Sequence, residues 1–261
     1  MIRGLYTSAS GMLAEMARTD VIANNLANVN TSGFKKDGAV FRAFPEMNIH
    51  RFNDPVTVGI GFKIDPAPFI GVLGTGVAVD EVYVDFAQGE LHPTSNPLDI
   101  AIKDEVSGWR SFFEVQAPNG ELLYTRDGSF TVDGEGYLVT KEGHYVMGES
   151  GPVNLSGGSK IVVNTDGEIY LDGRMVDRLR VVAFPQDALF EKMGDNLYRV
   201  QGQPSESNAQ IIQGALERSN VNAVSEMVNL ISAFRSYEAN QRIITAYDET
   251  LGKAVSEIAR I

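Results

Sequence analysis

The chain contains no cysteine and only three histidines among its 261 residues. Without cysteine, neither disulfide bonds nor thiol catalysis are available to it. His50, His92 and His144 stand alone in the sequence, and none has the His-x-x-x-His or glutamate-paired spacing of a zinc site. We therefore expect neither a bound metal ion nor another cofactor.

Basic residues are also scarce. Lysine and arginine number 22 against 34 aspartates and glutamates, which gives a formal net charge of -12. No local cluster of basic residues interrupts this acidic character, so the chain repels phosphate backbones and anionic lipid. Nucleic acid is not expected as a partner.

Long apolar runs are missing too. No stretch approaches the roughly 18 apolar residues that a membrane-spanning helix requires. The first residues also lack the basic segment, apolar core and small-residue cleavage site of a secretory signal. We expect no insertion into a membrane, and either a cytosolic location or export by another route.

The familiar catalytic motifs are absent as well. The segment 71–76 is glycine-rich like a phosphate-binding loop, but it lacks the Gly-Lys-Ser/Thr ending and no helical pattern follows it. No Gly-x-Ser-x-Gly nucleophile elbow occurs, and the Asp-Gly pairs lack the ligand spacing of a calcium loop. The sequence predicts a protein that is not an enzyme, with no catalytic residue.

What the chain does have is an apolar three-four repeat at each end. One repeat covers residues 2–26 and the other residues 227–258, and both are typical of the seam of a coiled coil. Thr19, Gln241 and Asp248 are the polar members. Because an amphipathic helix gains most of its stability from packing, each predicted helix needs a partner. The predicted assembly seam contains Leu5, Met12, Leu26, Met227, Leu230, Phe234, Tyr237, Ile244, Leu251 and Val255.

The alternative interpretation is two ordinary surface helices packed on a globular core. Against it, both repeats lie at the extreme ends of the chain, and Gly11 lies inside the first. A glycine in a helix interior costs about 1 kcal/mol relative to alanine. The first helix should therefore depend on docking for its stability.

Between the repeats, the apolar residues alternate with a period of two from Val77 onward, which predicts strands with one buried face. Five dipeptides accept the positive φ angles of tight hairpins, so several should close antiparallel hairpins. They are Asn119-Gly120, Asp127-Gly128, Asp133-Gly134, Asp166-Gly167 and Asp172-Gly173. The middle is expected to form an antiparallel β domain.

These patterns predict an α+β chain. We expect an N-terminal helix within residues 1–35, a proline-containing extended connector at 36–70, a β domain at 71–205 and a C-terminal helix within 206–261. The two helices should pair into one discontinuous α domain with the β domain inserted, which places the termini close together. Whether the connector orders only on assembly is left open.

Several motifs resemble one known family. Residues 24–35 are rich in asparagine, which a plain helix terminus would explain in part, because asparagine is a good capping and turn residue. The full string, preceded by Ser10-Gly11-Met12-Leu13-Ala14, resembles the amino-terminal signature of the bacterial flagellar rod and hook proteins. Residues 214–221, 226–227 and 235–240 resemble its carboxy-terminal signature, and residues 88–90, 94–102 and 124–130 resemble its middle. The motif residues are Asn25, Leu26, Ala27, Asn28, Thr31, Gly33, Phe34, Lys35, Ser219, Asn220, Val221, Glu226 and Met227.

The resemblance implies a structural subunit of the flagellar basal-body rod. It implies export by the flagellar type III apparatus without a cleavable signal peptide, and helical self-assembly into the extracytoplasmic axial shaft. The chain is most similar to the distal-rod members, with a proximal-rod or other hook-basal-body subunit as the alternative. The partners would be further copies of the chain, other rod and hook proteins, and the export apparatus.

A hypothesis from a different class is a secreted β module that binds carbohydrate or peptidoglycan, with the helical ends serving as an oligomerisation stalk. Trp109, Tyr137 and Tyr145 would then be the candidate binding platforms. Strand alternation instead favours core or rim positions for these aromatic side chains.

Overall fold

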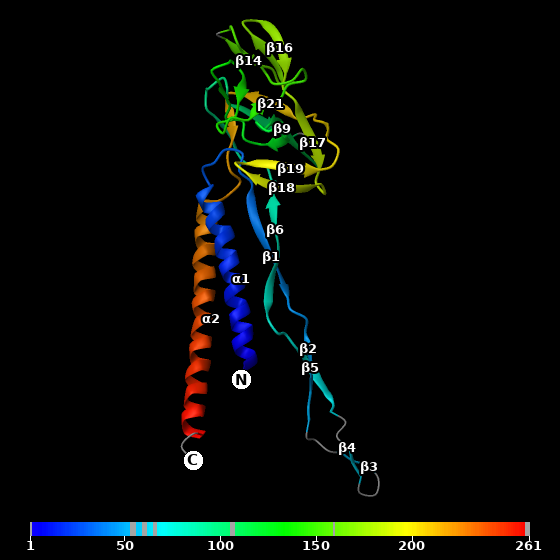
Figure 1. The fold of residues 1–261 in the computed structure, drawn as a ribbon, viewed down its shortest axis with the longest axis vertical. Coiled ribbons are helices and arrows are strands. Elements are labelled where there is room, and N and C mark those ends of the chain that lie inside the picture. Colours follow the sequence, from blue (N-terminus) through cyan, green and yellow to red (C-terminus); the bar gives the residue numbers. More distant parts are fainter. Residues whose placement is uncertain are drawn as a thin grey trace. The chain divides into compact units, whose positions relative to one another are not determined.

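The computed structural model describes residues 2–52, 56–58, 62–64, 67–104, 108–158 and 160–258. A long helix lies near each end of the sequence, and the segment that connects the two helices forms antiparallel strands (Figure 1). This confirms the predicted α+β class. No described helix is both long and apolar enough to cross a membrane. Pro55 and Pro66 of the expected connector lie outside the described residues.

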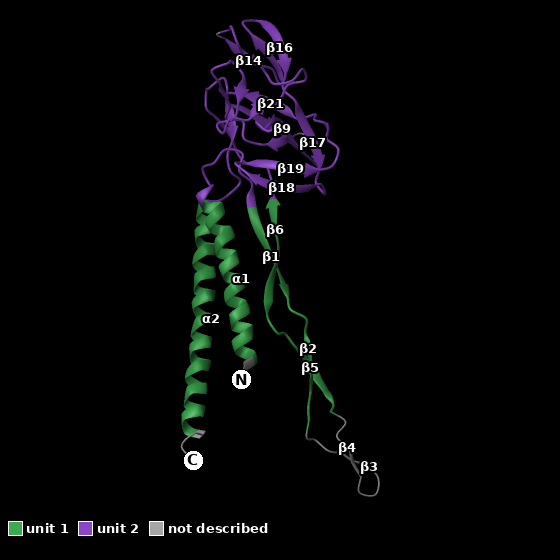
Figure 2. Cartoon of the chain, viewed as in Figure 1, with its two compact units in different colours: residues 1–26, 37–84, 223–261 green, residues 27–36, 85–222 purple. Residues whose placement is uncertain are grey.

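The chain divides into two compact units (Figure 2). Unit 1 contains Met1–Leu26, Asp37–Val84 and Ala223–Ile261, and unit 2 contains Ala27–Lys36 and Asp85–Asn222. The expected boundary between connector and β domain at residues 70 and 71 therefore differs from the observed division after Val84. Residues 71–84 group with the helices rather than with the β domain.

Within unit 1, α1 (Ile2–Ala27) and α2 (Ala223–Ile258) approach each other closely at Gly4 and at Gly11. A Cβ atom at Gly4 would lie 2.3 Å from the hydroxyl of Tyr247, and one at Gly11 would lie 2.9 Å from the amide nitrogen of Asn240. A seven-residue step along α1 thus matches a seven-residue step backwards along α2. The two helices run antiparallel, and Gly11 admits a neighbouring side chain.

The rest of unit 1 is a ribbon of paired strands, with β1 pairing with β6, β2 with β5 and β3 with β4. Its strands are β1 (Lys36–Ala43), β2 (Met47–His50), β3 (Val56–Val58), β4 (Phe62–Ile64), β5 (Phe69–Leu73) and β6 (Val77–Asp85). The expected connector is therefore extended, as predicted, but it is also paired. The alternation from Val77 onward does mark a strand, whose partner is β1 of the connector rather than a strand of the β domain.

Unit 2 is built around a sheet with the order β11-β12-β13-β9-β10-β19-β18, in which β17 also pairs with β9 and with β20. Its pairings are antiparallel, as predicted. The strands are β7 (Leu91–Pro93), β8 (Ile100–Lys103), β9 (Trp109–Gln116), β10 (Leu122–Thr125), β11 (Thr131–Val132), β12 (Leu138–Val139), β13 (Tyr145–Val146), β14 (Ile161–Val163), β15 (Glu168–Leu171), β16 (Arg174–Arg178), β17 (Val181–Pro185), β18 (Leu189–Gly194), β19 (Leu197–Gln201), β20 (Ser205–Glu206), β21 (Gln210–Gln213) and β22 (Ala215–Glu217). The central strand β9 supplies Phe112, Phe113 and Val115 to the core, where all three are fully buried.

The start of the C-terminal helical segment differs from expectation. Residues 206–217, expected to belong with the C-terminal helix, contain β21 and β22 instead, and α2 begins only at Ala223. β21 pairs with β8 and β22 pairs with β7. Buried Ile211 and Ala215 flank Gly214, whose φ angle is +74°, so this stretch suits strands that meet at a bend and not a helix.

Four of the five predicted turn dipeptides lie in hairpin connections, namely between β9 and β10, β11 and β12, β14 and β15, and β15 and β16. Asp127-Gly128 does not. A Cβ atom at Gly128 would lie 1.6 Å from the carbonyl oxygen of Ile100. Here the glycine is required by the close approach of two backbones, a need that the dipeptide alone does not reveal.

Candidate functional site

The loop that follows α1 packs against the end of β10. Gly33 has a φ angle of +66°, and a Cβ atom there would lie 2.5 Å from the backbone of Arg126 and Asp127. The hydroxyl of Ser32 donates a hydrogen bond of 2.7 Å to the carboxylate of Asp127. The amino-terminal motif and the 124–130 motif, far apart in the sequence, therefore form one contact in unit 2.

The carboxy-terminal motif joins the same contact. The backbone N–H of Gly33 donates to the carbonyl of Glu217 at 2.8 Å, and the N–H of Lys36 donates to Oδ1 of Asn220 at 2.8 Å. The amide nitrogen of Asn220 donates to the carbonyl oxygens of Asp85 and Ala87 at 2.8 and 3.1 Å. The chain after α1 thus lies directly beside the chain before α2.

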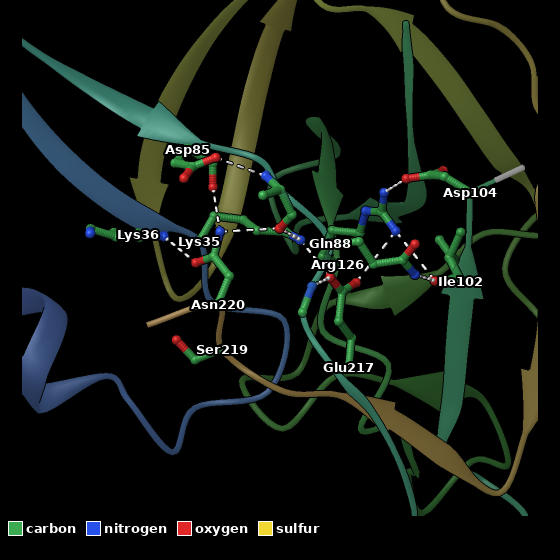
Figure 3. A network of polar contacts seen from close by, with 12 residues as sticks. Lys35, Lys36, Asp85, Gln88, Ile102, Asp104, Arg126, Glu217, Ser219 and Asn220 are labelled. Atoms are coloured by element: carbon green, nitrogen blue, oxygen red, sulfur yellow. Dashed lines mark hydrogen bonds and ion pairs between the residues drawn. The ribbon is translucent and has the colours of Figure 1, made fainter. Parts of the chain in front are cut away.

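Four charged side chains lie at the centre of this contact (Figure 3). We call Lys35, Asp104, Arg126 and Glu217 the latch network. Lys35 Nζ lies 2.5 Å from Glu217 Oε1, Arg126 Nη1 lies 3.4 Å from Glu217 Oε2, and Arg126 Nη2 pairs with Asp104. The side chains of Lys35, Arg126 and Glu217 are each 1% exposed, and that of Asp104 is 20% exposed. Two cations face two carboxylates, so the network is neutral.

Neighbouring groups supply further hydrogen bonds to the latch network. Lys35 Nζ donates to the carbonyl of Ala87 at 3.0 Å, and the N–H of Gly89 donates to Glu217 Oε1 at 2.8 Å. Arg126 Nη1 also lies 3.4 Å from the carbonyl oxygen of Ile102. The chain after β6 thus contributes backbone groups to the same buried charges.

Burial is the dominant electrostatic effect on Lys35. Removal of the Lys35 ammonium from water lowers its pKa, an effect that nearby Arg126 reinforces and the Glu217 carboxylate opposes. A buried ion pair adds little net stability over an apolar core, but loss of a single partner leaves an uncompensated buried charge. The latch network is therefore better suited to specifying how segments dock than to raising overall stability.

A second buried carboxylate, Glu114 on β9, is a source of pH dependence. It is 2% exposed and lies 3.3 Å from Arg180, and burial raises its pKa although Arg180 acts in the opposite direction. Because the folded-state pKa lies above the ordinary value of 4.5, stability is lost as pH rises through the interval between these two pKa values.

We predict that Glu114→Gln raises the midpoint of thermal unfolding at pH 7 and leaves it nearly unchanged below pH 4.5, where the carboxyl is neutral in both states. Thermal unfolding followed by circular dichroism across this pH range measures the effect. Glu142→Gln, at an exposed turn position, is the matched control and should show no such pH-dependent gain. A gain that is the same at both pH values would contradict the assignment.

The other motif residues lie on both sides of the division between the units. In unit 1, Asn25 is buried, and its amide exchanges two hydrogen bonds of 2.8 Å with the backbone of Asp37. In unit 2, Phe34 is buried beneath the ammonium of Lys192, which lies 4.6 Å from the ring centre. Glu226 and Val221 are buried, Leu26, Asn28, Thr31 and Ser219 are half-buried, and Ala27 and Met227 are exposed.

The predicted assembly seam is divided by the structure. Leu5, Met12, Leu26, Leu230, Tyr237, Ile244 and Leu251 are half-buried, whereas Met227, Phe234 and Val255 are exposed. On α2 the fully buried positions are Glu226 and Ala233, each one residue before a predicted seam position. The apolar repeat predicted that Met227 and Phe234 are packed, but the adjacent Glu226 and Ala233 are the buried residues.

Sequence reasoning missed the latch network except for Lys35. Glu217 and Arg126 both lie inside motifs that carry the family resemblance, but charged residues in turn-rich segments normally face water. The available signal was that three of the four charges, Lys35, Arg126 and Glu217, occur in three different motifs of the same resemblance. Nothing in the spacing of the motifs indicates that these charges meet.

The residues considered for other functions do not gather at one place. Tyr137 and Tyr145 are half-buried and pack edge to face on each other at 5.6 Å, and Trp109 is 41% exposed. His50, His92 and His144 lie in or beside separate strands. Among the described residues, no group of three or more His, Asp or Glu side chains is arranged to hold a metal ion.

Three models of flagellar protein families match separate segments of the chain. A family model for "Flagella basal body rod protein" matches residues 5–35, and one for "Flagellar hook protein FlgE/F/G D1 domain" matches residues 107–171. A third, for "Flagellar basal body rod FlgEFG protein C-terminal", matches residues 212–257. The segment matched by the first model includes Lys35, and the segment matched by the third includes Glu217.

Curated relatives match over almost the whole chain. The flagellar basal-body rod protein FlgG of Buchnera aphidicola subsp. Baizongia pistaciae is 35% identical, with coverage of 97% of this chain and 98% of that protein. FlgF of Caulobacter vibrioides is 33% identical and the hook-basal body complex protein FlhO of Bacillus subtilis is 31% identical, each with full coverage of both chains. Together with the three matched segments, these relatives show that the chain belongs to the flagellar basal-body rod protein family.

Proposed function

We propose that this protein is a structural subunit of the flagellar rod that assembles helically with copies of itself and with other rod and hook proteins. The observation that carries the proposal is a second apolar face on α2. Val224, Met227, Val228, Ile231 and Phe234 recur at helical spacing and are between 46% and 69% exposed. We call this second face the outer face of α2. A helix that is apolar on two faces is normally buried on both, so the outer face requires contact with another chain.

Other parts of unit 1 also leave apolar surface without cover from the same chain. On α1, Tyr6, Leu13 and Met16 are exposed. A pocket of about 480 Å³ lies among α1, α2 and the ribbon, lined by residues that include Tyr6, Met47, Leu73 and Ile243. Contacts with neighbouring subunits would bury these surfaces.

The ribbon supports the same proposal. It is two strands wide, and an isolated two-stranded ribbon is marginally stable in water. Its exposed apolar side chains include Phe44, Met47, Phe69, Ile70 and Val72. We propose that the ribbon, like the outer face of α2, is stabilised by packing against neighbours in the polymer.

Repetition of one such contact without closure produces an open helical array, which suits an axial shaft. The 35% identity with FlgG of Buchnera aphidicola favours a distal-rod subunit, and the similarity to FlgF and FlhO supports a proximal-rod or other hook-basal-body subunit as the alternative. Export by the flagellar type III apparatus is part of the proposal and is supported by membership of the family. The extracytoplasmic part of the basal body is then the site of assembly.

We predict that Phe234→Asp abolishes polymerisation without changing the unfolding of unit 2. The substitution places a charge on the apolar outer face of α2, and burial of an unpaired charge in an interface is strongly unfavourable. Sedimentation and negative-stain electron microscopy of the purified protein measure polymer formation, and circular dichroism follows unfolding.

Ser232→Asp is the matched control, because it adds the same charge at an exposed position of α2 outside the five-residue apolar face. It should leave polymerisation near the wild-type level. Ile244→Asp and Leu26→Asp probe the half-buried seam positions, and both should also block assembly. Normal polymers from Phe234→Asp would count against the outer face as an interface.

A further inference from the structure

We propose that Glu217 couples the docking of the two ends of the chain, so that residues 27–36 and residues 215–222 attach to the rest of unit 2 together. We call these the N-terminal and C-terminal docking segments. The first supplies Lys35 and the second supplies Glu217, whereas Arg126 and Asp104 belong to the body of unit 2. Each docking segment therefore brings one buried charge, and the two charges have opposite signs.

The docking of the two segments is coupled because the buried charges balance only when both segments are docked or both are absent. With neither segment docked, Arg126 and Asp104 form a neutral pair, and with both docked the four charges again balance. With the N-terminal segment alone, Lys35 would be buried beside Arg126 with only Asp104 to offset two cations. With the C-terminal segment alone, Glu217 would be buried together with Asp104 against a single cation. Both half-docked states bury an uncompensated charge, which is strongly unfavourable.

Backbone hydrogen bonds act in the same direction. The N–H of Gly33 donates to the carbonyl of Glu217, and the N–H of Lys36 donates to the side chain of Asn220. These donors in the N-terminal docking segment thus have acceptors in the C-terminal docking segment. A buried amide without an acceptor is costly, so the N-terminal segment gains its full set of contacts only when its counterpart is present.

The coupling has a consequence for the helices. The N-terminal docking segment directly follows α1, and the C-terminal docking segment directly precedes α2. A chain with one end held elsewhere, as during passage through an export channel, would keep the other end undocked. This consequence rests on the proposed function, whereas the coupling itself rests only on the contacts within unit 2.

Native-state hydrogen exchange on the full-length wild-type chain tests the coupling directly. The amide of Phe34, which donates to the carbonyl of Thr31 within the N-terminal docking segment, and the amide of Arg218, which donates to the carbonyl of Glu90, should report the same opening free energy, because segments that open together form one cooperative unit. Amides of β9 should be protected at least as strongly. Distinct opening free energies for the two docking segments would overturn the proposal, whatever the fate of any variant.

Variants distinguish an effect of charge balance on exchange from an effect of simply losing contacts. Lys35→Met should raise exchange at least about tenfold in both docking segments, not only in its own, and Glu217→Gln should do the same. The double variant restores neutrality and should exchange more slowly than either single variant. Lys141→Met, at an exposed turn, is the control and should change neither segment. Effects confined to the mutated segment, or effects that multiply in the double variant, would refute the charge-balance argument.

Discussion

Replacement of Arg126 by methionine is expected to lower the free energy of unfolding by about 3–5 kcal/mol, the range for removal of one partner from a buried ion pair. Arg126 is 1% exposed, pairs with both Asp104 and Glu217, and lies 5.5 Å above the ring of Phe112. Methionine fills most of the volume and keeps an apolar contact with Phe112. The loss should therefore arise from two carboxylates left with only Lys35 as a counterion. Chemical denaturation followed by tryptophan fluorescence measures the change.

Arg199→Met is the matched control, since Arg199 also pairs with two carboxylates, Glu121 and Glu191, but at the protein surface. Exposed ion pairs contribute little to stability because water and salt screen them. We expect a change close to the error of the measurement. Similar losses for Arg126→Met and Arg199→Met would show that burial of the latch network has no special energetic role.

The second large effect is expected from Gly128→Ala, which should lower the free energy of unfolding by about 3 kcal/mol or more. The new methyl carbon would lie 1.6 Å from the carbonyl oxygen of Ile100, a backbone atom that no rotamer change moves. The same two residues are joined by a hydrogen bond of 3.0 Å from the N–H of Ile100 to the carbonyl of Gly128. Relief of the clash would separate β8 from this loop.

Gly134→Ala provides the comparison for this substitution. Gly134 is also part of an Asp-Gly dipeptide, but no heavy atom lies within 4 Å of a Cβ atom built there. Its replacement should change stability little, as measured in the same denaturation experiment. If both alanine variants were equally stable, the close approach of residues 100 and 128 would not be a constraint on the fold.

These variants also test two separate structural roles within the 124–130 motif. Arg126 and Gly128 both lie in this motif. Arg126 pairs with Glu217 of the C-terminal docking segment, whereas Gly128 packs against Ile100 within the β domain. The Tyr124–Thr125 end of β10 pairs with β19, so the motif begins in the central sheet. Damage to Gly128 should therefore reduce the free energy of unfolding by disturbing the β domain directly, and damage to Arg126 should reduce it by weakening the attachment of the docking segments.

Local patterns predicted those features that depend on neighbouring residues in the chain. The three-four repeats predicted both helices, because the periodicity of an amphipathic helix is visible in a single segment. Asn119-Gly120 and Asp172-Gly173 predicted hairpins, since the φ angles of a tight turn depend on the residues at the turn itself. The pairing of β6 with β1 was not predicted. Alternation identifies a strand but contains no information about its partner.

The sequence alone thus determined the α+β class, the terminal helices, the antiparallel middle and the family, because each depends on periodicity, turn chemistry or a contiguous motif. Only the tertiary structure showed that Lys35, Arg126 and Glu217 meet and that Glu226 and Ala233 of α2 are buried while the adjacent Met227 and Phe234 are exposed. Those features depend on which distant segments share a buried volume. The sequence does not distinguish a charged residue that will be buried from one that will stay in water, because the difference in their electrostatic energy arises only when folding removes the water.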